Sequence, residues 1–121
     1  MPLRFRSRRA VLGGGLALLS HAAEAHAILE DSTPKAGDTV PAGTMALRLR
    51  FNSRIDKARS SLTLTRPDQT KIETPIDPGG PPDILTATVT LTPGAHTLRW
   101  QVLALDGHIT RGDVAFSVTE R

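Results

Sequence analysis

Two places in this sequence, far apart along the chain, could together hold a metal ion. The first is His26, which follows the small residues of Ala23-Glu24-Ala25. A chain that began at His26 would carry a free α-amine and an imidazole on one residue, and the amine nitrogen and Nδ1 can close a six-membered chelate ring. The unperturbed pKa of such an amine is about 7.7–8.0, so a metal can displace its proton at neutral pH. The alternative is that an arbitrary polar residue follows the cleavage site.

The second place is Asp106-Gly107-His108, which lies between two apolar stretches. Asp-Gly is a common hairpin signal, so a tight turn alone accounts for the first two residues. His108 needs another explanation, because an Asp-x-His pair on a turn can direct a carboxylate oxygen and an imidazole nitrogen to one side. With the two nitrogens of His26, this gives three nitrogens and one oxygen. Such a set suits Cu(II) best, with Ni(II) and Zn(II) as weaker competitors.

Other candidate ligands are few. His96 alternates with Leu98, Trp100 and Val102, so we expect it to face the core or the end of a sheet. The chain has no cysteine, which excludes thiol chemistry and disulfides. Any metal site must therefore use nitrogen and oxygen ligands.

Residues 1–25 are predicted to be a signal peptide, which would make His26 the amino terminus of the processed chain. They contain four arginines near the start, the short apolar stretch Ala10–Leu19 and small residues before the cleavage point. Ser7-Arg8-Arg9-Ala10-Val11-Leu12 resembles a twin-arginine export signal, and a general secretory signal is the alternative. Either route leads out of the cytoplasm, so we expect a protein that acts outside it.

Removal of this segment changes the electrostatic character of the chain. It takes away four arginines and one glutamate, so the net charge of +3 falls to zero. Binding to nucleic acid then loses its support from composition. The 96 residues that remain, 26–121, fit one domain. No later segment approaches the roughly 20 apolar residues of a membrane-spanning helix, so we expect a soluble protein.

The elements that must position the candidate ligands are β-strands. Apolar and polar residues alternate with a period of two over residues 45–51, 62–65, 85–91, 98–102 and 114–118. Residues 27–31 and 71–74 read as weaker strands. Turn signals rich in proline, glycine and aspartate separate these stretches. We predict an all-β fold of about seven strands, as a two-sheet sandwich or a Greek-key barrel.

Several motifs between residues 26 and 121 are those of a known family. They are His26-Ala27-Ile28-Leu29, Ser32-Thr33-Pro34-Lys35-Ala36-Gly37, Leu47–Phe51, Pro93-Gly94, Leu98-Arg99-Trp100-Gln101-Val102, Asp106-Gly107-His108, Gly112 and Phe116-Ser117-Val118. Together they resemble the CopC family of periplasmic copper-binding proteins. The resemblance implies an immunoglobulin-like β-sandwich or barrel that binds Cu(II) through the amine and ring of His26, Asp106 and His108. It also implies a separate membrane partner of the CopD type, and we expect a monomer.

Two residues depart from the family pattern. Some CopC proteins have a methionine-rich segment that holds Cu(I), whereas Met45 is the only methionine after residue 25 and lies on an alternating strand. We therefore expect Met45 in the core and no Cu(I) site. His96 stands where many relatives have a tyrosine, and we interpret it as a substitute in packing or hydrogen bonding.

The leading functional interpretation is a binding protein without enzymatic activity: a Cu(II) carrier or buffer in copper resistance or homeostasis. The alternative is a histidine-brace copper oxygenase of the polysaccharide monooxygenase type. Against the oxygenase stand the small size, the absence of tyrosine and the single tryptophan, which leave little aromatic surface for a sugar chain. Asp106 would also fill the position that oxygen chemistry needs open. A metal-free adhesion-like sandwich would leave His26 and the Asp-x-His turn unexplained.

Overall fold

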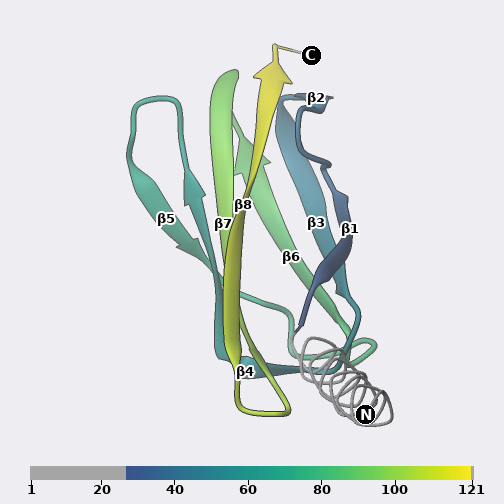
Figure 1. The fold of residues 1–121 in the computed structure, drawn as a ribbon. Helices are drawn as coiled ribbons and strands as arrows, with labels where there is room; N and C mark the ends of the chain where they lie inside the picture. Colours follow the sequence, from purple (N-terminus) through teal and green to yellow (C-terminus); the bar gives the residue numbers. More distant parts are fainter. Residues whose placement is uncertain (1–26, 121) are drawn as a thin grey trace, which may run out of the picture.

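The protein is a two-layer β-sandwich, described by a computed structural model over residues 27–120 (Figure 1). Its strands are β1 (Leu29–Thr33), β2 (Thr39–Pro41), β3 (Gly43–Phe51), β4 (Ile55–Thr65), β5 (Lys71–Thr74), β6 (Ile84–Leu91), β7 (Gly94–Ala104) and β8 (Ile109–Thr119). One sheet has the order β1-β3-β6 and the other β2-β8-β7-β4-β5. The predicted all-β, immunoglobulin-like Greek-key sandwich is confirmed. The predicted signal peptide and His26 lie outside the described residues.

Between residues 27 and 120 the sandwich has eight strands, where about seven were expected. β2 is the short extra strand, and it pairs in parallel with the end of β8, where Val40 lies opposite Val118. Three residues are too few to show a period, and Pro41 indicates a turn in the sequence. The proline is tolerated because β2 lies at the edge of its sheet.

The period of two in the sequence is the alternation between core and solvent. Leu47, Leu49 and Phe51 of β3 are almost completely buried, whereas the residues between them are more exposed. Phe51 meets Trp100 of β7 edge to face, with ring centroids 5.2 Å apart. Met45 packs against this core and is partly buried, as expected. Within residues 27–120, no helix is long and apolar enough to cross a lipid bilayer.

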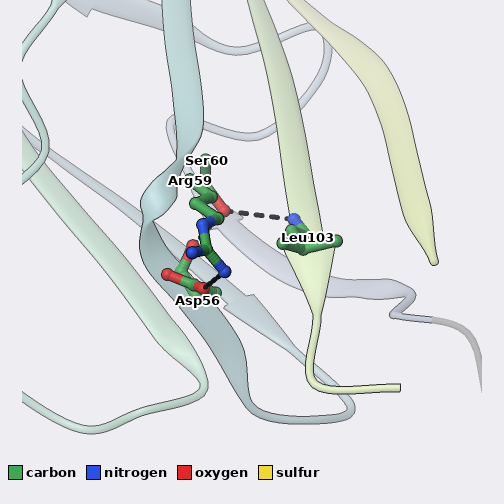
Figure 2. Close-up of polar contacts among 4 residues, drawn as sticks. All are labelled: Asp56, Arg59, Ser60 and Leu103. Atoms are coloured by element: carbon green, nitrogen blue, oxygen red, sulfur yellow. Dashed lines mark hydrogen bonds and ion pairs between the residues drawn. The ribbon is translucent and has the colours of Figure 1, made fainter. Parts of the chain in front are cut away.

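The pairing of β4 with β7 is interrupted by a bulge near the end of β7. Asp56 pairs with Leu103 and Ser61 with Gln101, so four residues of β4 lie opposite a single residue of β7. The hydroxyl of Ser60 accepts the N–H of Leu103 at 3.1 Å and donates to the carbonyl of Asp56 at 2.7 Å (Figure 2). This hydroxyl takes the place of a ladder hydrogen bond. The Ser60 hydroxyl therefore joins β4 to β7 at the bulge, beyond which regular pairing resumes at Asp56 and Ile55.

Candidate metal centre

The hairpin between β7 and β8 forms a tight turn at one end of the sandwich (Figure 1). The N–H of Gly107 donates to the carbonyl of Ala104 at 2.9 Å, and the N–H of Ala104 donates to the carbonyl of His108 at 2.9 Å. Gly107 has a φ of 89°, a left-handed conformation that glycine adopts without a steric penalty. The turn expected from Asp-Gly is therefore present, and β8 begins at Ile109 directly after His108.

The turn brings the side chains of Asp106 and His108 together. Oδ1 of Asp106 accepts the backbone N–H of His108 at 3.0 Å, which is the bond of an Asx turn. The second oxygen, Oδ2, lies 3.1 Å from Nδ1 of His108. The side chain of His108 is 58% exposed and that of Asp106 is 27% exposed, so the pair is open to solvent.

This separation fits two ligands of one metal ion. Nitrogen and oxygen ligands stand about 2.0–2.2 Å from a divalent ion such as Zn²⁺, and two of them at right angles are then roughly 3 Å apart. The 3.1 Å between Nδ1 of His108 and Oδ2 of Asp106 agrees with that value. Within residues 27–120, no group of three or more His, Cys, Asp or Glu side chains could hold a metal. Asp106 and His108 are therefore the two candidate donors, among those predicted, that lie within the described residues.

The start of the described chain lies beside this hairpin. The hydroxyl of Thr110, two residues after His108, donates to the carbonyl of Ala27 at 2.9 Å. Ala27 is only 2% exposed and belongs to the hydrophobic core. The residue that follows His26 in the sequence is thus attached to the strand that follows His108. His26 itself, the third predicted site residue, lies outside the described residues.

A second contact fixes the same segment from the other sheet. The N–H of Ile28 donates to Oδ1 of Asn52 at 2.7 Å, and the N–H of Asn52 donates to the carbonyl of Ile28 at 3.0 Å. Asn52 directly follows β3. Sequence reasoning did not single out Asn52 or Thr110, because nothing in their immediate neighbourhood indicates where their partners lie.

His96 has the packing role expected for it. Its side chain is buried at 2% exposure and stacks on Phe116 of β8, with ring centroids 5.5 Å apart and an angle of 14° between the rings. Nδ1 lies 3.2 Å from the carbonyl oxygen of Gly94. His96 lies near the start of β7, whereas the Asp106 turn follows the end of that strand.

The fold and this turn define a small β-sandwich protein with a candidate metal site at one end. The profile of the CopC domain matches residues 29–119, and this chain belongs to the CopC family. Protein YobA of Escherichia coli strain K12 is 33% identical over 98 residues, which cover 78% of this chain and 79% of YobA. The resemblance noted in the sequence is therefore confirmed.

Solved structures agree with this assignment. The crystal structure of CopC from Methylosinus trichosporium OB3b superimposes with a TM-score of 0.73 at 29% identity, over 79% of this chain and 96% of that one. PcoC, a copper resistance protein from Escherichia coli, gives a TM-score of 0.65 at 22% identity, over 76% of this chain and 99% of PcoC. The likeness to PcoC concerns the fold.

Proposed function

We propose that this protein binds one Cu(II) ion outside the cytoplasm and acts as a copper carrier or buffer in copper resistance or homeostasis. The proposed ligands are the α-amine and imidazole of His26, a carboxylate oxygen of Asp106 and the imidazole of His108. The observation that carries the proposal is the 3.1 Å approach of His108 to Asp106 on the β7–β8 turn. Ala27, the neighbour of His26, is hydrogen-bonded to the strand that leaves this turn.

The donor set favours Cu(II) over other ions. Three nitrogens and one oxygen suit the tetragonal coordination that Cu(II) prefers, and Cu(II) also stands highest in affinity among the divalent ions of the first transition row. No thiolate is present in the chain to favour Cu(I). Membership of the CopC family supports copper as the metal, and the related fold of PcoC belongs to a protein described as a copper resistance protein.

The proposal requires cleavage after Ala25 during export to the periplasm. Signal peptidase would then leave His26 with a free amine. The mass of the exported protein tests this step directly, because retention of even one residue before His26 contradicts it.

We further propose that the processed chain is a monomer and exchanges copper with a separate inner-membrane protein of the CopD type.

The deciding experiment converts the α-amine of His26 to an amide and changes no side chain of the protein. A chain that begins at His26 is compared with one that carries a single additional residue before it, which converts the amine to an amide that binds copper only after a costly deprotonation. We expect the Cu(II) affinity to fall by orders of magnitude, measured by competition with a chelator of known affinity. The electron paramagnetic resonance spectrum should also show coupling to one nitrogen fewer.

The two chains form a matched pair, because they contain the same imidazoles and carboxylates. An added residue at a chain end disturbs little packing, and equal thermal unfolding of the two metal-free chains checks this. Equal Cu(II) affinities with the same spectrum would refute the N-terminal chelate. The site would then have to be rebuilt around His108 and other ligands.

A further inference from the structure

Residues 27 and 28 are held between the two sheets by three hydrogen bonds. Thr110 of β8 binds the carbonyl of Ala27 at 2.9 Å from the five-stranded sheet. Asn52, at the end of β3, binds the N–H of Ile28 at 2.7 Å and its carbonyl at 3.0 Å from the three-stranded sheet. We call Asn52 and Thr110 the N-terminal clamp.

The N-terminal clamp holds the first residues of the domain that the structure describes. The first residues of a domain are usually poorly ordered unless they are tied down. Fixing the backbone of one residue costs about 1–2 kcal/mol at 25 °C, and a ligand that is ordered only on metal binding lowers the affinity by that cost. Here Ala27 is buried and hydrogen-bonded through contacts with other parts of the protein, none of which involves a metal.

The bond from Thr110 is not part of a strand ladder. β1 pairs with β3, and β8 pairs with β2 and β7, so β1 and β8 belong to different sheets. The methyl group of Ala27 already contributes to the core. The hydrogen bond from the hydroxyl of Thr110 also fixes the orientation of the Ala27 carbonyl. Thr110 comes two residues after His108 in the sequence, so this bond holds Ala27 near the β7–β8 turn.

We propose that Asn52 and Thr110 are positioning residues for the metal site. By holding Ala27 and Ile28, they would bring the amine and ring of His26 toward Asp106 and His108. This inference rests on the proposed function, because it concerns the same Cu(II) site. Neither residue of the clamp is a metal ligand.

Thr110→Val tests the clamp, because valine keeps the shape of the side chain and removes the hydroxyl. Loss of groups that orient metal ligands typically lowers metal affinity by about 10–100-fold, and we expect a fall in Cu(II) affinity of this order. Thr110→Ser retains a hydroxyl and should retain most of the affinity. Thr119→Val is the matched control: Thr119 lies at the other end of β8, and its hydroxyl is 3.4 Å from the carbonyl of Val40. Its Cu(II) affinity should be unchanged.

A measurement without copper checks the ordering itself. Asn52→Ala removes the acceptor for the N–H of Ile28, so hydrogen exchange at this amide should become faster in the metal-free protein. Asn52→Asp keeps a side-chain oxygen and should keep the protection. Exchange at Ile28 that is as slow in Asn52→Ala as in the wild type would overturn the role of Asn52.

The final test separates positioning from general stabilisation. In the chain extended by one residue, the amine is no longer a ligand, so Thr110→Val should cause little further loss of the residual affinity. An equal loss in the processed and extended chains would mean that Thr110 does not act through the terminus. A wild-type processed chain that binds Cu(II), together with a Thr110→Val variant of equal affinity, overturns this inference alone. A processed chain that binds no Cu(II) overturns the proposed function, and the inference with it.

Discussion

His108 offers a test of the proposed metal site that should leave the fold nearly unchanged. Its side chain is 58% exposed, so His108→Ala removes little buried surface. Exposed substitutions usually change the free energy of unfolding by less than about 0.5 kcal/mol. The backbone N–H that donates to Asp106 is also retained in the variant. A change in copper binding can therefore be attributed to the imidazole.

The expected magnitude follows from the coupling of binding to unfolding. Free Cu(II) at 100 times the Kd raises the free energy of unfolding by about 2.7 kcal/mol. For a domain of this size, each kcal/mol shifts the Tm by roughly 4–8 °C, so copper should raise the wild-type Tm by about 11–22 °C. Loss of a ligand should weaken binding at least as much as loss of the groups around it, or about 100-fold. The variant at the same copper concentration then gains only about 0.4 kcal/mol, or roughly 2–3 °C.

The assay is thermal unfolding followed by circular dichroism, with and without buffered Cu(II). Asp106→Asn should fall between the wild type and His108→Ala, because its amide oxygen still accepts the N–H of His108 but carries no charge. Arg111→Ala, an exposed change in β8 three residues after His108, should keep the full copper shift. A copper shift in His108→Ala as large as that of the wild type would refute the assignment of His108 as a ligand.

Three further predictions concern the core, an ion pair and the oxidation state of copper. Gly112→Ala should lower the free energy of unfolding by about 1–3 kcal/mol, because the added Cβ would lie 2.6 Å from Cζ2 of Trp100. Urea unfolding followed by the emission of this single tryptophan measures the change. An unchanged midpoint of unfolding would contradict the close packing of Gly112 against Trp100. The Arg99 hydrogen bonds at 2.8 and 2.9 Å hold the pKa of Asp113 below its usual range, so the pair stabilises the fold above the ordinary aspartate pKa of about 3.9 and loses this contribution as the pH falls through the lower folded value. Stability curves of the wild type and Asp113→Asn should therefore converge in acid, and a constant difference would count against this linkage. In competition with a Cu(I) chelator, the protein should retain Cu(I) only weakly. Tight retention of Cu(I) that survives Met45→Leu would mean that other residues bind Cu(I).

Most of the sandwich could be predicted from the sequence because its strands carry a local signal. Leu47, Leu49 and Phe51 alternate with polar residues, and this period is enough to assign a strand with one buried face. The Asp106-Gly107 pair likewise predicts a turn from its own backbone preferences. The first half of β4 was missed because its charged residues break the alternation of apolar and polar residues. The short β2 was missed because three residues cannot establish a period.

The sequence by itself determined which donor types are available, with no cysteine among them, and it predicted a site from a histidine after a predicted cleavage point and an Asp-x-His turn. Only the tertiary structure placed Ala27 beside the strand that leaves this turn, through a hydrogen bond between residues 83 positions apart in the chain. The physical reason is the range of each signal. Periodicity and turn preference depend on neighbouring residues, whereas the bond from Thr110 to Ala27 exists only when two complete sheets pack against each other.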